Sequence, residues 1–534
     1  MAKKPVKKEV AKVKKTDVTK APKEKRKKIE TVIGPIVSRF PIKTQHTLDQ
    51  PLDEYTRDNL KVYGSYVVEQ RAVPDFRDGL KPVHRAVLWS MVDLGLRPDK
   101  AYKKSARTVG QAIGVYHPHG DSAAYDAMVT ITNTVPPFVA GQGGFGSPST
   151  MASAMRYTEA KMSKFTHSFL LDPDYLKVVP YVPNFSNDAK IPLYMPALLP
   201  TLFFITNIPA PAYGVKAGNP AFSMRSIADL VINMLRGKEF SAKKLAEKLE
   251  IYHPFGCTDI SKDSDIETMM ETGKGNVTYA PLVETDVAKR TIYLRSHVPT
   301  TLASEESIQK TLNKISEIDG VKAAYNTPGK KDKRAGPFGA LCVVECPKNM
   351  DEDRFDEVCH KVDIILKSSV NYRLGITIRR ENSPNEFKYL DYVTYFKAWI
   401  NYRLKLESRL IAHLIEKAER ELHINEVYLF AVENMEKLLK LLPKVLVAKD
   451  PNEALAKSLK IPVEDAIIIL DRKVRQLAKL EADALKAKIK GLKADIKTLK
   501  AEAKNPGERA ALDTERRVKT YLKNPDVTQS GLAL

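Results

Sequence analysis

The sequence predicts a multidomain α+β protein from three features: its length, alternating strand and helix patterns in its middle part, and long helical patterns towards its C-terminus. The chain has 534 residues, which corresponds to roughly three or four domains. Strand patterns at 276–282, 291–296, 341–346 and 374–380 are separated by helical ones. Residues 392–422 have the apolar spacing of one uninterrupted helix.

The charge of the chain points to a polyanionic partner. A hydrophobic content of 43% is ordinary, whereas a formal net charge of +21 is not, and nucleic acid is the commonest partner of such basic proteins. Residues 1–40 form a lysine-rich segment that we expect to be disordered, either adding salt-sensitive affinity for DNA or acting only as a solubility tail. There is no signal-peptide core and no apolar run long enough for a membrane span, so we expect no membrane association and a cytoplasmic, nucleoid-associated location.

The four cysteines form no Cys-x-x-Cys pair. A zinc site is therefore disfavoured, and buried free thiols in a reducing compartment are expected.

A cation-rich loop follows the first helical pattern, which covers residues 51–69. The segment 71–85 reads RAVPDFRDGLKPVHR, and Pro82 is suited to start the helix predicted at 83–94. Its basic side chains either belong to a charged loop in contact with solvent or contact the phosphates of DNA.

A helix, a turn and a second helix are predicted next. The first covers 103–114 with Val109 and Ile113 inward, and the break is Tyr-His-Pro-His-Gly at 116–120. The second starts at Asp121 or Ser122 and runs to about 131, with Ala124, Met128 and Ile131 inward. This order is that of a helix-turn-helix, whose second helix can enter a DNA groove.

His117, His119 and Asp121 have two interpretations. They could ligate a metal ion, but Pro118 separates the histidines and no further ligand is evident. Phosphate contact or proton transfer by the histidines is favoured.

A glycine-rich stretch at 141–147, GQGGFGS, precedes Tyr157 in the sequence Ala-Met-Arg-Tyr-Thr-Glu. Taken alone, it is typical of a surface loop leading to a half-buried tyrosine. Glycines also permit close backbone approach and positive φ. A tyrosine hydroxyl, of pKa about 10, needs help to act as a nucleophile, and the neighbouring Arg156 could stabilise negative charge that develops on a phosphate.

Five of these motifs occur in a fixed order within about ninety residues: RAVPDFRDGLKPVHR, AYKKSAR, YHPHGDSA, GQGxFGS and AMRYTE. In this the chain resembles the breakage-reunion subunit of type IIA DNA topoisomerases, that is, the A subunits of gyrase and of topoisomerase IV and the corresponding bacteriophage protein. The resemblance implies a winged-helix (helix-turn-helix) DNA-binding domain in which Tyr157 cuts one strand and holds its 5′ phosphate, assisted by Arg156.

The resemblance also implies a set of DNA contacts around the cleaved bond and no metal site in this chain. The residues carried over are Arg71, Lys81, His84, Arg85, Lys103, Lys104, Arg107, His117, His119, Ser122 and Asp126. The chain departs from the family pattern at Ala86, where a second arginine is common, and in a short, non-acidic insert before AMRYTE.

The match continues more weakly from residue 190 into what would be the family's tower domain, an α/β domain. The family bends DNA with an isoleucine inserted between base pairs. Here the aligned position falls on Pro211 with Ile208 nearby, and a packed proline-rich turn is the alternative.

A long antiparallel coiled coil with a globular dimer gate is expected after the tower. Leu485, Ile489, Leu492, Ile496 and Leu499 alternate spacings of four and three, which is a heptad seam. With the helix at 392–422 it would form the coiled coil, with a tip at 427–448 and 462–470; a simple helical bundle is the alternative. No propeller-like repeat follows, so we expect the DNA-wrapping domain of gyrase to be lacking.

The predicted domains are a basic tail, the cleavage domain, the tower, the coiled coil with its gate, and a C-terminal tail. Their ranges are 1–40, 41–188, 189–390, 391–505 and 506–534.

The expected function is the cleavage subunit of an ATP-dependent type II topoisomerase that relaxes or decatenates double-stranded DNA. It would form a homodimer through the dimer gate at the end of the coiled coil (the C-gate). Two such chains would form a heterotetramer with an ATPase subunit resembling the B subunit of gyrase, and this partner would bind most of the ATP and Mg²⁺. The alternatives are a non-catalytic architectural DNA-binding protein that keeps the fold, and a basic coiled-coil scaffold.

Overall fold

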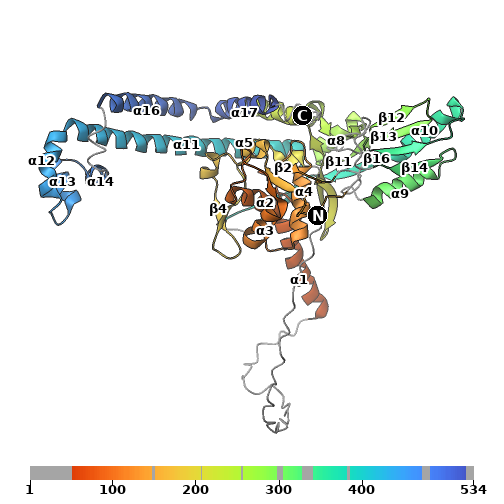
Figure 1. The fold of residues 1–534 in the computed structure, drawn as a ribbon, viewed down its shortest axis with the longest axis horizontal. Coiled ribbons are helices and arrows are strands. Elements are labelled where there is room, and N and C mark those ends of the chain that lie inside the picture. The colour runs from red at the N-terminus through yellow and green to blue at the C-terminus, as the bar shows by residue number, and fades with distance from the viewer. Residues whose placement is uncertain are drawn as a thin grey trace, which may run out of the picture. The chain divides into compact units, whose positions relative to one another are not determined.

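The structure is a computed structural model with mixed helices and sheets (Figure 1). It describes residues 51–146, 151–205, 207–253, 256–296, 305–327, 341–381, 385–471 and 482–524. The predicted tail at 1–40 lies outside these residues. The chain divides into two units, residues 1–59 and 60–534. Of the first unit, the described part is the start of one helix, in which Arg57 lies 3.5 Å from Asp53.

The helices around the predicted turn confirm most of the sequence pattern. Pro82 begins its helix, and Val109, Ala124, Met128 and Ile131 are buried. The region contains α1 (Leu52–Val67), the π-helix η2 (Val68–Ala72), α2 (Pro82–Asp93), α3 (Ser105–Gln111), the π-helix η3 (Ala112–Tyr116) and α4 (Asp121–Thr132).

A three-stranded antiparallel sheet, with strand order β1-β3-β2, lies beside these helices. The elements of this part are β1 (Lys103–Lys104), β2 (Val139–Gln142), β3 (Glu159–Met162), α5 (Lys164–Phe169), η4 (Tyr175–Val178), β4 (Tyr181–Pro183), β5 (Lys190–Pro192) and η5 (Thr201–Phe204). Lys104 pairs with Glu159 in the β1–β3 register, so the strands end where the tyrosine turn begins.

A five-stranded sheet follows, in the order β10-β11-β16-β7-β6. Its strands are β6 (Asn207–Ala212), β7 (Val215–Asn219), β10 (Thr258–Asp259), β11 (Lys274–Ala280) and β16 (Ser368–Arg373), and near it lie β8 (Ala221–Phe222), β9 (Ile251–Tyr252), α6 (Met224–Leu235), α7 (Ala242–Lys248) and α8 (Asp263–Thr272). β6 and β7 form a hairpin whose two connecting residues, Tyr213 and Gly214, both have positive φ, as tight hairpin turns require.

A second antiparallel sheet, β12-β13-β15-β14, carries two helices on one face. Ile292 and Val344 of this sheet pack with Leu312 and Phe355 of the helices, forming a core separate from the main one. The elements are β12 (Val283–Asp286), β13 (Thr291–Leu294), α9 (Glu305–Ser316), β14 (Ala323–Asn326), β15 (Cys342–Glu345) and α10 (Glu352–Leu366). The four strands predicted in this part of the chain are confirmed as β11, β13, β15 and the later β17.

The hairpin of β17 (Gly375–Ile378) and β18 (Glu386–Tyr389) joins the sequence-distant loop at 73–77. The N–H of Phe76 donates to the carbonyl of Thr377 at 3.0 Å, and the N–H of Thr377 donates to that of Pro74 at 2.9 Å. This loop is thereby fixed to the part of the chain that leads into the longest helix.

The C-terminal helices are α11 (Tyr392–Glu433), α12 (Met435–Val445), α13 (Pro451–Leu459), α14 (Val463–Leu470), α16 (Ala482–Glu502) and α17 (Pro506–Leu522). α11 and α16 run side by side (Figure 1), with Leu485, Ile489 and Ile496 buried. α12, α13 and α14 share a small core that includes Leu438, Leu455 and Ile469.

The predicted C-terminal tail is wrong for residues 506–522, because this stretch is the packed helix α17. Ala510, Ala511 and Tyr521 on α17 are buried, and Arg236 at the end of α6 lies 3.3 Å from Glu508. The helix contacts α6, α11 and α5. Among the described residues, no helix has both the length and the apolar character that crossing a membrane would need.

Candidate active site

Tyr157 is an exposed phenol on a turn whose next residue is buried. Its side chain is 65% exposed, whereas Thr158 is 0% exposed. The N–H of Tyr157 donates to the carbonyl of Ala154 at 2.9 Å, which closes the turn. The guanidinium carbon of Arg156 lies 4.9 Å from the centre of the Tyr157 ring. The turn therefore presents a nucleophilic group and a cation together to solvent.

The glycine-rich stretch packs against this turn, which explains why glycines are needed there. Gly143 has a φ of +98°, and a Cβ on it would lie 3.3 Å from the carbonyl oxygen of Tyr157. A Cβ on Gly144 would lie 2.6 Å from Ser153 Oγ, and the Ser153 N–H donates to the Gly144 carbonyl at 2.8 Å. The close approach that the sequence suggested is thus an approach to the tyrosine turn. Ser147, the last residue of the motif, lies outside the described residues.

The N-terminus of α3 holds the same turn from its other side. The N–H of Ser105 donates to the carbonyl of Thr158 at 3.0 Å, and that of Ala106 donates to Met155 at 3.3 Å. Helix N-termini have N–H groups without intrahelical partners. These two carbonyl acceptors flank Tyr157 in the chain, so the turn is bound on both sides of the exposed residue.

Two π-helices lead directly to residues of the predicted site. η2 ends beside the exposed Arg71, and η3 ends one residue before His117. Short π-helical segments occur often at functional sites. The rings of His117 and His119 stack with their centres 4.2 Å apart. Burial lowers the pKa of His117 to about 4, with smaller contributions from His119 and Arg71, so this imidazole is neutral at pH 7.

Further residues of the predicted site are exposed on α3, on α4 and on β1. Ser122 and Asp126 are exposed one turn apart on α4, where side chains four residues apart are neighbours. Lys103, Lys104 and Arg107 are exposed at the start of α3 and in β1. Lys104 also lies 3.4 Å from Glu159.

Comparison with known proteins decides the family. A family model that describes the A subunit of DNA gyrase and topoisomerase IV matches residues 71–515. The chain belongs to this family of gyrase and topoisomerase IV A subunits. The matched residues include the turn with Tyr157, Arg71 and His117 at the ends of the π-helices, and the long helices α11 and α16.

Individual relatives agree with this assignment. The chain is 29% identical over 452 residues to the A subunit of DNA gyrase from Helicobacter pylori, covering 83% of this chain and 53% of that protein. It is 29% identical over 487 residues to the A subunit of DNA topoisomerase 4 from Haemophilus influenzae, covering 89% and 61%. The A subunit of DNA gyrase from Borreliella burgdorferi is 29% identical over 456 residues, covering 83% and 54%. The chain thus spans about half the length of the gyrase proteins that it matches.

Two of the DNA contacts implied by the resemblance have buried side chains. Arg85 is 1% exposed and donates to both carboxylate oxygens of Asp78, at 2.8 and 2.9 Å. His84 is 5% exposed, and burial lowers its pKa to about 3, with Lys81 and Arg85 acting in the same direction. Both side chains are core groups here. Lys81 is half-buried, and burial lowers its pKa.

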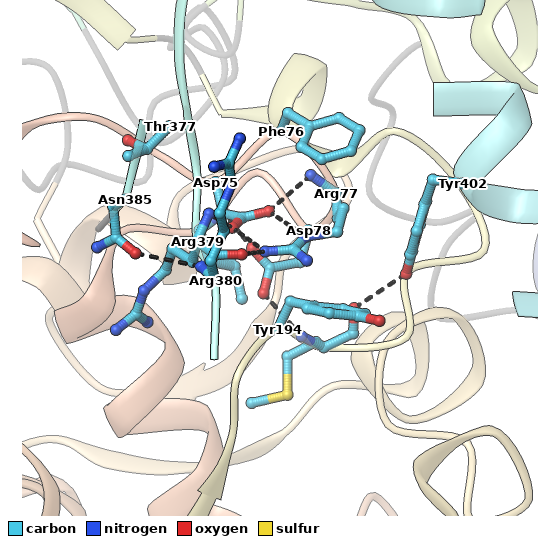
Figure 2. A network of polar contacts seen from close by, with 12 residues as sticks. Asp75, Phe76, Arg77, Asp78, Tyr194, Thr377, Arg379, Arg380, Asn385 and Tyr402 are labelled. Atoms are coloured by element: carbon cyan, nitrogen blue, oxygen red, sulfur yellow. Dashed lines mark hydrogen bonds and ion pairs between the residues drawn. The ribbon is translucent and has the colours of Figure 1, made fainter. Parts of the chain in front are cut away.

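The acidic residues of the 71–85 loop were not singled out in the sequence, yet they organise it. Asp75 accepts two hydrogen bonds from the guanidinium of Arg77, at 2.6 and 2.8 Å, one from the Arg77 N–H at 2.9 Å, and one from the N–H of Arg379 at 3.1 Å. Figure 2 shows this group, with Tyr194 beside the Arg77 guanidinium, 3.8 Å from the ring centre. The loop therefore joins the region of α2 to α4 to the β17–β18 hairpin.

Three hydroxyl residues near Tyr157 were also not predicted from the sequence, namely Ser105, Tyr125 and Thr158. Ser105 was expected inside a helix, whereas it is the first residue of α3. The sequence signal available for Ser105 was its place in the KKSAR motif, directly after two lysines.

The remaining predictions concern metal and the DNA wedge. Among the described residues, no group of three or more His, Cys, Asp or Glu side chains is placed to hold a metal ion. Ile208 and Pro211 lie on β6, with Pro211 paired to Lys216 two residues from the hairpin turn. Their side chains lie outside the described part.

Proposed function

We propose that this chain is the DNA-cleaving and rejoining subunit of an ATP-dependent type IIA topoisomerase. The observation that carries the proposal is the exposed Tyr157 beside Arg156, on a turn fixed by the glycine-rich stretch and by α3, inside the region that matches the family. A tyrosine that only covers part of the surface would not need its turn to be fixed by both the glycine-rich stretch and α3.

The proposed reaction is a reversible transesterification. The Tyr157 oxygen attacks the phosphorus of a DNA phosphodiester, a tyrosyl–phosphate bond forms at the 5′ end, and the bond to the 3′ oxygen breaks. The phenol proton leaves as the oxygen attacks, and the departing 3′ oxygen gains a proton. Arg156 would stabilise charge on the non-bridging oxygens, and neutral His117 can accept a proton or a hydrogen bond. Resealing is the same step reversed, so it needs no ATP.

Basic and polar side chains of this region supply the proposed duplex contacts. Phosphate contacts position a protein on DNA without reading its sequence. The contacts proposed are Arg71, Lys81, Lys103, Lys104, Arg107, His117, His119, Ser122 and Asp126. With α3, α4 and the β1-β3-β2 sheet they would form the winged-helix domain, within residues 41–188.

The sheets and helices within 189–390 would be the tower, extending the DNA surface. The β6–β7 hairpin carries the wedge candidates Ile208 and Pro211. A fluorescence-transfer measurement of DNA bending tests them: Pro211→Ala or Ile208→Ala should reduce the bend, and if neither does, the hairpin is not the wedge.

We propose that α11 and α16 form the coiled coil and that α12, α13 and α14 form the dimer gate. Apolar side chains are exposed on α12, on α14 and on the residues after α12, which suits an interface that opens and closes. They are Leu439 at 49%, Leu446 at 64%, Val447 at 84%, Val463 at 44% and Ile467 at 38%.

The active assembly would be a heterotetramer of two such chains and two ATPase subunits resembling the B subunit of gyrase, acting on double-stranded DNA in the cytoplasm or nucleoid. ATP and Mg²⁺ would be bound mainly by the partner. Relaxation and decatenation are the expected outcomes.

The test is detergent trapping of cleavage on supercoiled plasmid, with Mg²⁺ and a partner that resembles the gyrase ATPase subunit. Wild type should give protein-linked linear DNA and Tyr157→Phe none. Tyr325→Phe, a substitution of a 40% exposed tyrosine on β14, is the matched control and should cleave as wild type. Binding and bending of DNA with no covalent product from wild type would favour the architectural alternative.

A further inference from the structure

Three buried hydroxyl groups meet directly behind the exposed Tyr157. Thr158 Oγ1 donates to Ser105 Oγ at 2.8 Å and lies 2.9 Å from the hydroxyl of Tyr125. The Tyr125 hydroxyl donates to the carbonyl of Ser153 at 2.7 Å. Ser105 and Thr158 are 0% exposed and Tyr125 is 7% exposed. We call Ser105, Tyr125 and Thr158 the hydroxyl cluster.

The hydroxyl cluster connects three separate elements of the cleavage region. Ser105 begins α3, Tyr125 lies on α4, and Thr158 belongs to the tyrosine turn. Leaving a buried hydroxyl without a hydrogen-bond partner costs free energy. The cluster therefore favours the arrangement of these three elements in which its hydroxyls are in contact. The backbone bonds from α3 to Met155 and Thr158 fix the turn's main chain, and the cluster adds a side-chain bond from the residue next to the nucleophile.

We infer that the hydroxyl of Thr158 is a positioning group for the attack by Tyr157. This inference rests on the proposed function. In-line attack on phosphorus requires the reacting oxygen to be held close to one geometry, and a misplacement of about 1 Å can reduce a rate about a hundredfold. Tyr157 itself is 65% exposed, its N–H donates to the carbonyl of Ala154, and its ring lies beside the exposed guanidinium of Arg156. Its position therefore depends on the residues attached to it, and Thr158 is anchored by its side chain.

Thr108 provides a comparison within the same helix. It is 0% exposed on α3, one turn after Ser105, and its hydroxyl has no hydrogen-bond partner in the described structure. A buried threonine hydroxyl in this helix is thus compatible with folding without contacting the turn. Thr108→Val and Thr158→Val each remove a hydroxyl from a fully buried threonine, and only the second breaks the hydroxyl cluster.

The experiment compares single-turnover cleavage of a linear duplex by the full chain, with Mg²⁺ and the same ATPase partner. Thr158→Val should reduce the cleavage rate about 10- to 100-fold, while DNA affinity changes by less than about threefold. Thr158→Ser, which keeps the hydroxyl, should recover most of the rate. Ser105→Ala should reduce it in the same direction, and Thr108→Val should cleave as wild type.

Each outcome bears on one of the two claims. If wild type forms no covalent product, the proposed function fails, whatever the variants do. If wild type cleaves and Thr158→Val cleaves equally fast, the positioning role is overturned. It is also overturned if affinity falls as much as rate, if Thr158→Ser is as slow as Thr158→Val, or if Thr108→Val is equally impaired.

Discussion

Arg85 and Asp78 form a buried, two-bonded ion pair at the base of the loop that carries the predicted DNA contacts. The Arg85 side chain is 1% exposed and that of Asp78 is 0% exposed, with Nε 2.8 Å from Oδ2. Asp78 also accepts the N–H groups of Leu80 at 3.0 Å and Met195 at 2.7 Å. The carboxylate is therefore fully used inside the protein, and the arginine is held in the interior of the loop.

Asp78→Asn should destabilise the protein strongly, because it leaves a buried guanidinium without its counter-charge. The expected loss is about 3–5 kcal/mol. Urea unfolding followed by tryptophan fluorescence measures it, since Trp89 lies on α2 with Arg85, and Trp399 donates to the carbonyl of Arg77 at 3.0 Å.

The matched control for that substitution is an exposed ion pair. Glu416 lies 3.1 Å from Arg420 on α11, with side chains 68% and 73% exposed. Glu416→Gln should change the free energy of unfolding by less than about 1 kcal/mol. Equal effects at the two sites would mean that burial does not determine the strength of the Arg85–Asp78 pair.

The neutral His84 should make the protein less stable in mild acid. Burial, Lys81 and Arg85 hold its folded pKa at about 3, below the ordinary value of about 6.5. Between these values the unfolded chain binds a proton and the folded one does not, so stability falls as pH falls. By pH 5 the loss is about 2 kcal/mol.

Comparison with His84→Gln isolates this contribution, because other groups, including His117, titrate in both proteins. The difference in free energy of unfolding between wild type and the variant should shrink by about 2 kcal/mol from pH 7 to pH 5. His360→Gln, at an exposed position on α10, should leave the pH dependence unchanged. A difference that stays constant with pH would show that folding does not lower the pKa of His84.

The sequence allowed the tyrosine turn and its exposed surroundings to be predicted, because linked motifs mark them. It did not distinguish surface cations from buried ones in the 71–85 loop. Arg71 and Arg85 look alike in a list of basic residues, but Arg85 is neutralised by Asp78, whose position depends on a contact with Met195 far along the chain. Such a contact has no local pattern.

α17 was missed for a similar reason. Its buried side chains include small ones, Ala510 and Ala511, and its charged residues look typical of a solvated tail. Glu508 and Glu515 in fact lie 3.3 and 3.2 Å from Arg236 on the end of α6. Helical patterns with large apolar residues, such as α11 and α16, were predicted more readily because their periodicity is strong.

Gly141→Ala should impair both folding and cleavage. A Cβ there would lie 2.6 Å from the Phe145 ring and 2.7 Å from Thr132, and overpacking of this kind costs about 1–3 kcal/mol. Cleavage-complex trapping and urea unfolding measure the two effects. Gly110→Ala is the control, since nothing lies within 4 Å of a Cβ at that position on α3. Alanine is the better helix former by about 1 kcal/mol, so this variant should be slightly more stable and cleave normally. Loss of cleavage in both variants would contradict the inference that cleavage depends on close packing in the glycine-rich stretch.

Three ion pairs between α11 and α16 follow an antiparallel heptad. Glu419, Glu426 and Glu433 are spaced by seven residues, and they meet Lys500, Lys493 and Lys486 at 2.7, 2.8 and 3.0 Å. Charges flanking an apolar seam set partner and register in coiled coils. These side chains are 42–58% exposed, so each pair contributes only about 0.2–1 kcal/mol.

A charge swap at the central pair tests whether the ladder sets this register. Glu426→Lys should destabilise the protein, because it places two lysines opposite one another, and adding Lys493→Glu should restore stability by recreating the pair in reverse. The coupling energy from the four proteins should be about 0.2–1 kcal/mol and should decline in 1 M salt, where charges are screened beyond about 3 Å. Additive effects of the two substitutions, or a coupling that salt leaves unchanged, would mean that the apolar seam alone fixes the alignment of α11 with α16.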